Sequence, residues 1–391
     1  MPDQFYHGVE VVEIDNGTRP IETVKSSVIG LIGTAPSCTD EEAFPLNTPV
    51  LIAGRRTEAA KLGTSGTLPK AIDGIFDQTG AMIVVVRVAA EGTGENADAA
   101  TISNVIGGVD EDTGQREGLQ AFSGAKSILG VQPRIIIAPG FSHQLAVATE
   151  MVSICDSLKA IAFIDGPNTT DAAAVAYAEN FSSARVMVID PWVKVWDTTL
   201  NAHVSDPPSA RAAGLLAKSD NERGWWWSPS NQGMNGIVGT TRPVDFAMGD
   251  ANCRANYLNE NKVATIIQED GYRLWGNRSC TADGKWKYLC VRRTADMINE
   301  SLLQAHLWAV DRGITKTYVE DVRFGVESYL RHLVSIGAIL GGSCWLDNEI
   351  NSDDQIANGC VYWDFDFTPI YPCEHPTFRS HLVDDYIEEI F

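Results

Sequence analysis

The sequence predicts a mixed α/β and α+β fold, with an N-terminal α/β domain, a smaller C-terminal α+β domain and a strand-forming arm at each end. Apolar strand patterns alternate with helical patterns through the first two thirds of the chain. The last third instead holds two long helical patterns and one half-polar strand pattern. The predicted divisions are an arm at 1–20, domains at 21–250 and 251–370, and an arm at 371–391.

The first predicted element is a β-rich run at residues 5–14, closed by the turn signal Asp15-Asn16-Gly17. A strand without neighbours has unpaired N–H and C=O groups that need partners. This run therefore either completes a sheet in another subunit or adds an edge strand to its own domain. The positions expected to carry this pairing are Phe5, Val9, Val11, Val12 and Ile14.

The N-terminal domain is predicted to begin with strands at 28–34, 49–54 and 82–88 and helices at 56–62 and 68–78. The run at 82–88 is almost continuously β-branched, which is typical of a strand buried on both faces. Residues 91–118 are rich in Gly, Asp and Asn, so loops are expected there.

A regular alternation of strands and helices follows. The pattern predicts strands at 134–138, 160–165 and 185–190, and helices at 144–157, 171–180 and 209–217. Alternation of this kind indicates layered α/β structure with mostly parallel strands.

In the C-terminal domain, strands are expected at 263–267 and 272–275, and long helices at 294–311 and 319–340. A half-buried strand is predicted at 359–367. Its apolar positions are Val361, Trp363, Phe365 and Phe367. The chain ends in a segment that fits either a strand face or a helical stripe, through Phe378, Leu382, Tyr386 and Ile390.

Composition narrows the class of protein. A chain of 391 residues with 44% hydrophobic residues can bury a large core, while its net charge of −21 argues against binding to nucleic acid or anionic membranes. No apolar run approaches the ~20 residues that span a bilayer, and the N-terminus does not fit a signal peptide. The eight cysteines are scattered without a CxxC pair, which favours reduced thiols and assembly in a cytosol.

Signals for chemistry are weak, so we expect no catalytic residue, cofactor or metal. Gly92-Thr93-Gly94-Glu95-Asn96-Ala97 matches a dinucleotide-binding spacing, but its carboxylates would repel a pyrophosphate. Cys360, Cys373, His375 and His381 have irregular spacing for zinc. Two readings stay open: a soluble α/β enzyme that uses the Gly92 loop, and a carbohydrate-binding module with an aromatic platform at residues 225–227.

Several segments together resemble one family. The most specific runs from Leu258-Asn259-Glu260 through Asp270-Gly271-Tyr272-Arg273-Leu274-Trp275-Gly276-Asn277-Arg278-Ser279-Cys280, and others are 7–21, 44–52, 134–140, 305–311 and 362–369. They resemble contractile tail sheath proteins, in particular the compact sheaths of temperate myophages and R-type pyocins, which are similar to the type VI secretion sheath.

The resemblance implies a structural subunit with an outer N-terminal domain and an inner C-terminal domain. Each arm would add a strand to a neighbour's inner domain, with the strand at 359–367 helping to receive it. Subunits would form a helical stack of rings around a tail tube protein, assemble in the host cytoplasm, and end at baseplate and tail terminator proteins in the virion. An inner-domain helix would face the tube, with Arg323 and Arg331 as candidates. Another tail or baseplate subunit is the alternative.

The resemblance also implies a mechanism without a nucleotide, nucleic acid or membrane insertion. The extended sheath would be metastable, and contraction would drive the tube through the host envelope.

Overall fold

The computed structural model describes residues 21–91, 97–198, 200–347, 349–384 and 386. The chain forms two compact units. The large unit comprises Ser27–Arg293 and Tyr371–Phe391, and the small unit comprises Met1–Ser26 and Thr294–Ile370.

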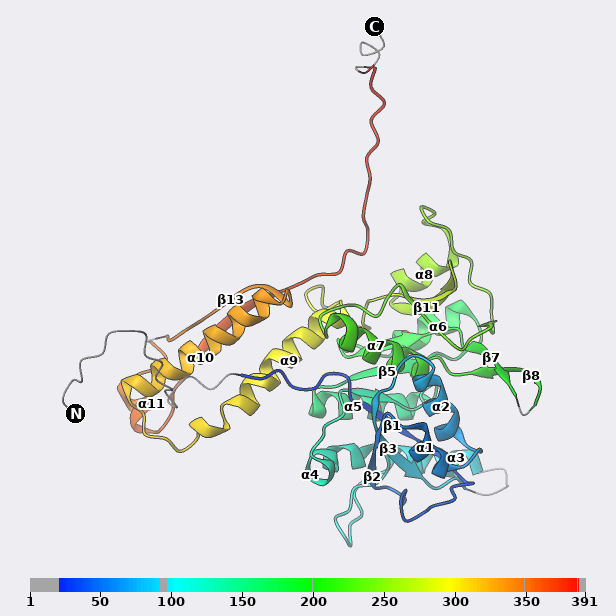
Figure 1. Cartoon of the computed structure of the whole chain (residues 1–391), viewed down its shortest axis with the longest axis horizontal. Helices are drawn as coiled ribbons and strands as arrows, with labels where there is room; N and C mark the ends of the chain where they lie inside the picture. Colours follow the sequence, from blue (N-terminus) through cyan, green and yellow to red (C-terminus); the bar gives the residue numbers. More distant parts are fainter. Residues whose placement is uncertain (1–20, 92–96, 199, 348, 385, 387–391) are drawn as a thin grey trace, which may run out of the picture. The chain divides into compact units, whose positions relative to one another are not determined.

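The centre of the large unit is, within the described residues, a nine-stranded mixed sheet (Figure 1). Its strand order is β2-β3-β1-β4-β5-β6-β11-β12-β9. Strands from β3 to β11 run parallel, and β2, β12 and β9 are antiparallel additions at the edges. The strands are β1 (Ile29–Thr34), β2 (Pro49–Ala53), β3 (Met82–Val88), β4 (Ile135–Ile137), β5 (Ile161–Asp165), β6 (Val186–Ile189), β9 (Gln232–Gly233), β11 (Val263–Gln268) and β12 (Tyr272–Trp275).

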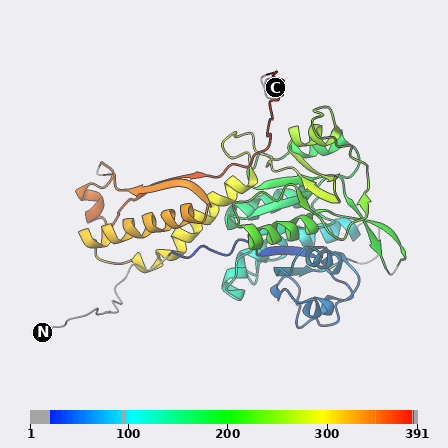
Figure 2. The same cartoon turned by 45° about the horizontal axis from the view of Figure 1, so that its top comes forward.

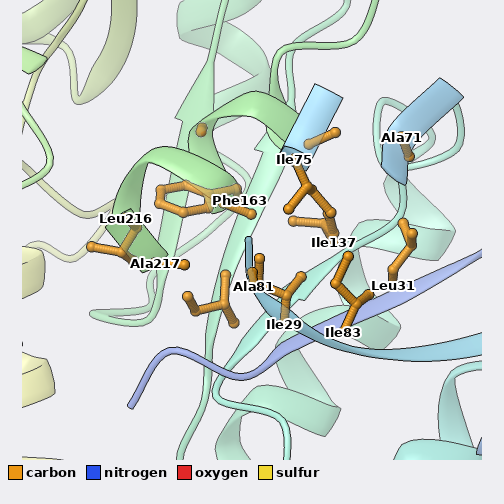
Figure 3. Packing of buried hydrophobic residues seen from close by; sticks show 14 of the residues in the cluster. Ile29, Leu31, Ala71, Ile75, Ala81, Ile83, Ile137, Phe163, Leu216 and Ala217 are labelled. Carbon is orange, nitrogen blue, oxygen red and sulfur yellow. The ribbon is translucent and has the colours of Figure 1, made fainter. Parts of the chain in front are cut away.

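Helices cover both faces of this sheet, which explains why its central strands are apolar on both sides. Helices α2 (Thr67–Phe76) and α7 (Ser209–Arg223) pack on one face. Figure 3 shows Ile75 and Leu216 from these helices against strand residues such as Phe163. The opposite face is covered by α3 (Ala97–Ile106), η2 (Gly118–Gly124), α4 (Ala125–Leu129), α5 (Leu145–Leu158) and α6 (Asp171–Ala178).

Smaller elements complete the large unit. Beside the sheet, a three-stranded sheet is formed by β10, β7 and β8. The remaining elements are α1 (Arg56–Ala59), η1 (Ala60–Leu62), β7 (Val193–Asp197), β8 (Ala202–Asp206), β10 (Gly239–Thr240) and α8 (Arg254–Glu260). At Gly33 in β1, an added Cβ would lie 2.2 Å from Thr67 Oγ1, so only glycine allows the start of α2 to approach the strand.

The small unit is a helical layer on a β-hairpin. Helix α9 (Leu289–Ala305) enters it from the large unit and continues into η3 (Leu307–Ala309). Helix α10 (Lys316–Ser335) then packs against the antiparallel pair β13 (Ile339–Trp345) and β14 (Asp364–Pro369), as Figure 2 shows. The short helix α11 (Asp353–Ala357) lies in the connection between the two strands. Among the described residues, every helix is too short or too polar to cross a membrane.

The division between the units differs from the predicted boundary at 250. It lies at Arg293, because β11 pairs in parallel with β6 through Val263↔Val188 and joins the large sheet. Strands β11 and β12, which were predicted in the C-terminal domain, thus belong to the large unit.

Two predictions of local structure were also wrong. The expected loop at 91–118 contains α3, whose Val105 is fully buried. The helix predicted at 319–340 ends at Ser335 and is followed by β13. The helix predicted at 209–217 continues to Arg223, and the one predicted at 294–311 runs from Leu289 to Ala305. The other strands and helices predicted between residues 28 and 275 are present at closely similar positions.

Candidate assembly site

The β13–β14 hairpin has two unpaired edges among the described residues. Each strand pairs only with the other, from Trp345↔Asp364 to Ile339↔Pro369, so this sheet has two strands. Outward-facing N–H and C=O groups on such edges can pair with an added strand. The hairpin is therefore the part of the small unit best suited to accept one.

The two faces of the hairpin differ. Phe365 and Phe367 are two positions apart in β14, and their rings are nearly parallel with centroids 6.3 Å apart. Phe367 is opposite Gly342, and a Cβ on Gly342 would lie 3.4 Å from methyl groups of Leu330 in α10. Opposed residues share a face of the sheet, so Phe367 is on the side of α10. Phe365, two residues earlier in the same strand, is on that side as well. Their half-buried side chains thus face the helix, and an acceptor role falls to the backbone edge.

The predicted acceptor strand begins too early. Tyr362 donates its backbone N–H to Asn351 Oδ1, and its carbonyl accepts from Asn351 Nδ2, each at 2.8 Å. This side chain occupies the groups that strand pairing would use, so β14 starts only at Asp364. Val361 and Trp363 consequently precede the strand.

Trp363 has a different place in the structure. Its indole Nε1 donates to the carbonyl of Val319 at 3.1 Å, and its ring is edge-on to Tyr318 with centroids 6.1 Å apart. Trp363 therefore fastens the segment before β14 to the first turn of α10.

The N-terminal arm residues Phe5, Val9, Val11, Val12 and Ile14 lie outside the described residues. The chain that follows them runs along the small unit. Val24 donates its backbone N–H to Ser301 Oγ of α9 at 3.1 Å, and the Thr23 hydroxyl is 3.0 Å from the Tyr329 hydroxyl of α10. The base of the N-terminal arm is thus held by the two long helices.

The described part of the C-terminal arm is extended and exposed. Phe378 is 97% exposed, Leu382 100% and Tyr386 71%, while Ile390 lies outside the described residues. From 375 to 384 the chain forms neither a helix nor a strand. Large apolar side chains with such exposure in one subunit mark an interaction surface.

The last fixed point in this arm, before its exposed part at 375–384, is a polar cluster that we call the C-terminal anchor, composed of Arg278, Tyr288 and Glu374. Arg278 donates from Nε and Nη2 to the two carboxylate oxygens of Glu374, both at 2.8 Å. The Tyr288 hydroxyl donates to Glu374 Oε2 at 3.2 Å. Partial burial works to raise the pKa of Glu374, but the hydrogen bonds and charge of Arg278 outweigh it and lower that pKa.

The charged candidates on α10 lie together on one helical face. Arg323 Nη1 is 3.1 Å from Glu327 Oε1, and Arg331 Nη1 is 3.7 Å from Glu327 Oε2. The Arg323 guanidinium also lies over the ring of Phe324, 4.5 Å from its centroid. Both arginines thus share one carboxylate, that of Glu327.

In the large unit, polar side chains fill the carboxyl edge of the parallel strands, where α/β folds commonly bind ligands. Asp165 at the end of β5 accepts hydrogen bonds from the hydroxyls of Ser142 and Ser209, each at 2.8 Å, and from the Ser209 amide at 2.9 Å. Burial raises the pKa of Asp165 to about 6 despite these donors. The chain's own side chains therefore complete this part of the edge.

A second polar network follows β6. Arg242 bonds to Asp190, which is fully buried, and to Asp171 at 2.7 Å, while Arg254 Nε lies 2.7 Å from Asp171. Burial raises the pKa of Asp190 in spite of Arg242. For Asp171, hydrogen bonds from Arg254 and Arg242 outweigh burial and lower the pKa. These pairs fix the segment around Arg242 to the sheet.

Features that suggested other functions have structural roles or lie outside the description. The residues 92–96 of the Gly92 loop lie outside the described residues. Trp225 is buried and edge-on to Trp226, and only Trp227 is substantially exposed, at 49%, so the three rings form no flat platform. All eight cysteines are free thiols, and the described residues contain no group of three or more His, Cys, Asp or Glu that could hold a metal.

Three family models together match most of the chain. They are the tail sheath protein Gp18 domain III N-terminal region at residues 26–88, the phage tail sheath protein central domain at 114–280, and the phage tail sheath C-terminal domain at 281–382. A putative prophage major tail sheath protein of Pseudomonas aeruginosa (strain UCBPP-PA14) is 47% identical over 99% of this chain and 98% of its own.

The chain belongs to the phage tail sheath family.

Further relatives agree with this assignment. The tail sheath protein of Escherichia phage P2 is 39% identical over 99% of this chain and 98% of its own length. Two solved structures share the fold. They are the PVC sheath of an extracellular contractile injection system in its contracted state (TM-score 0.71, 18% identity, 98% and 99% of the two chains) and the contracted helical sheath of the anti-feeding prophage (TM-score 0.71, 20% identity, 96% and 98%).

The sheath subunit is accordingly a structural protein of a contractile tail. The mixed α/β fold and the family predicted from the sequence are confirmed. The sequence reasoning did not find Arg278, Tyr288 and Glu374 as a cluster, because residues that are 86 and 96 positions apart in the chain meet only in the fold.

Proposed function

We propose that this sheath subunit polymerises into a helical stack of rings around a tail tube, linked by strands that both arms donate to neighbours. The observation that carries the proposal is that one chain has both an exposed apolar arm and a hairpin whose edges are unpaired among the described residues. An added strand would satisfy the backbone groups of the edge and bury the arm's apolar side chains at once.

The small unit would then be the inner part of the sheath and the large unit the outer part. Both phenylalanines of β14 pack toward α10, so a donated strand would add to the backbone edge while the core of the small unit stays intact. Contacts that link one surface to a different surface of the next copy do not close on themselves, and they generate a helical sleeve.

The sleeve would act through stored free energy. The extended state would form on the tube in the host cytoplasm, between baseplate and tail terminator proteins, and persist because rearrangement is slow. Contraction would move the subunits as nearly rigid bodies, with the arms as hinges, into a lattice with more favourable contacts. The tail tube would thereby be driven through the host envelope.

Truncation and electron microscopy test the proposal. The purified full-length chain, concentrated without partners or with tail tube added, is expected to form hollow striated tubes of uniform width. Chains that lack residues 1–17, or everything after Pro376, should stay folded by circular dichroism yet remain unpolymerised, because each lacks one donated strand.

Two outcomes would contradict the proposal. Long tubes from both truncated chains would show that the arms are not the linkers. Closed rings without tubes from the full-length chain would instead favour another tail or baseplate subunit.

A further inference from the structure

We propose that the C-terminal anchor is a positioning device: it fixes the point at which the C-terminal arm leaves its own subunit, and so presents Phe378 and Leu382 to a second copy of this chain. The inference rests on the proposed role of the arms in assembly. It concerns Arg278, Tyr288 and Glu374, whose contacts lie within the large unit.

The position of the anchor in the chain is the first argument. Strand β14 ends at Pro369 in the small unit, and the chain enters the large unit at Tyr371. Glu374 is the last described residue with an ion pair or hydrogen bond, and residues 375–384 are all exposed. The arm therefore becomes free directly after the anchor.

The geometry of the anchor is the second argument. The paired hydrogen bonds from Arg278 fix the orientation of the Glu374 carboxylate as well as its distance, because a planar guanidinium matches both oxygens. The Tyr288 ring is in turn edge-on to Tyr371, with centroids 6.4 Å apart. Residues 371 and 374 are thus held on either side of Pro372.

Arg278 and Tyr288, which hold Glu374, are themselves held by the large unit. Arg278 and Tyr288 face each other in an isolated antiparallel bridge, and Tyr288 is only 7% exposed. The amide of Leu289, at the start of α9, donates to the carbonyl of Asn277 at 3.1 Å. The anchor thus connects the arm to the base of a long helix and to a buried aromatic ring.

Pro376 restricts the backbone between Glu374 and Phe378. Pro376 lies two residues beyond Glu374 and two before Phe378, and its ring restricts the backbone to extended conformations. Phe378 lies four residues beyond Glu374 but nine beyond Pro369, where the ordered chain would end without the anchor. Release of Glu374 would thus lengthen the tether of Phe378 from four residues to nine. Because the effective concentration of a tethered group falls roughly as the −3/2 power of tether length, the effective concentration of Phe378 at its binding site on the second copy would fall about threefold.

A charge-swap cycle tests the inference in the full-length chain. Arg278→Glu and Glu374→Arg each place like charges in the anchor, and each should slow tube formation, followed by light scattering and electron microscopy, by about threefold or more. The double variant restores an opposite pair, so it should assemble at close to the rate of the unmodified chain. Lys61→Glu, which breaks the exposed pair with Asp40 in the same unit, is the matched control and should not change the rate.

Backbone mobility in the dilute, unassembled subunit gives a second readout. NMR order parameters of residues 371 and 373–375 should fall in both single variants and recover in the double variant, while those of β5 and β6 should not change. Normal assembly or unchanged order parameters in the single variants, or failure of the double variant to recover, would overturn the inference.

The chain truncated after Pro376 separates this inference from the proposed function, because it keeps the anchor and loses the apolar arm. If this truncated chain forms tubes at the full rate, the arm is not a linker, and both the function and the inference fail. If truncation abolishes tubes while the single anchor variants assemble normally, only the inference fails.

Discussion

At the scale of single residues, Asp165 shows how the large unit tolerates a buried acid. The carboxyl group has no exposed surface, and three donors from Ser142 and Ser209 surround it. Desolvation still dominates, so its pKa rises to about 6. The sequence could not reveal this cluster, because its members are 23 and 44 residues from Asp165 and only the parallel sheet brings them together.

Replacement of Asp165 with Asn should change how stability depends on pH. Between pH 4 and pH 6 the native state binds more protons at Asp165 than the unfolded state, so its free energy of unfolding falls as pH rises through this range. Asp165→Asn removes that decrease. The difference in free energy of unfolding between the variant and the unmodified chain should therefore shift in favour of the variant, by up to about 3 kcal/mol, between pH 4 and pH 7. Urea denaturation of the unassembled subunit at several pH values measures this.

Glu222→Gln, on the exposed side of α7, is the control and should keep the pH dependence of the unmodified chain. Identical pH dependence in the Asp165 variant and the unmodified chain would contradict the assigned pKa.

At the scale of elements, two local predictions failed for different reasons, and the first concerns the end of α10. The amide of Ala338 donates to Leu333 O at 2.8 Å, and that of Gly337 to Val334 O at 3.0 Å, with Gly337 at φ +74°. This is the Schellman arrangement, which ends a helix at a glycine. The glycine was a readable signal, but β13 after it depends on pairing with β14. The second failure is the loop predicted at 91–118. There the alanines that favour helix α3 lie inside a segment rich in Gly, Asp and Asn, so the loop signal dominated.

Charge reversal on α10 tests the predicted tube-facing surface. Arg323→Glu combined with Arg331→Glu should weaken sheath assembly on purified tail tubes, because it replaces both cations of this face with anions. Each exposed ion pair with Glu327 contributes only about 0.3–0.5 kcal/mol, so the subunit should stay folded. Counting decorated tubes by electron microscopy measures the effect, and Lys316→Glu at the exposed start of α10 is a control.

A third substitution separates tube contact from helix stability. Adding Glu327→Arg to the two reversals restores both ion pairs with opposite polarity. If this triple variant assembles on tubes as the unmodified chain does, the arginines act only within the helix and the tube-facing assignment is wrong.

At the scale of the whole molecule, the two units differ in how they are stabilised. The large sheet has helices on both faces and strands such as β1 and β6 with every residue buried. The small unit relies on a two-stranded hairpin with α10 on one side, and isolated hairpins are marginally stable. A subunit built in this way has a rigid body and an incomplete sheet, which suits assembly by strand addition.

Hydrogen exchange before and after polymerisation tests this difference. In the free subunit, amides of β1 and β6 should exchange far more slowly than those of β13 and β14, because buried strands open only with large-scale unfolding. In assembled tubes, protection of the β13–β14 edges should rise at least about tenfold as those amides gain partners. Unchanged protection in tubes would show that donated strands do not pair there.

The sequence by itself determined the layered α/β body, the β-branched central strands, the long helices and the family. These follow from local periodicity and from segments that are contiguous in the chain. The tertiary structure alone decided the boundary at Arg293, the pairing of β13 with β14, the place of Trp363 and the anchor of Arg278, Tyr288 and Glu374. Each depends on partners far apart in sequence, and no local pattern records which distant segments will pair.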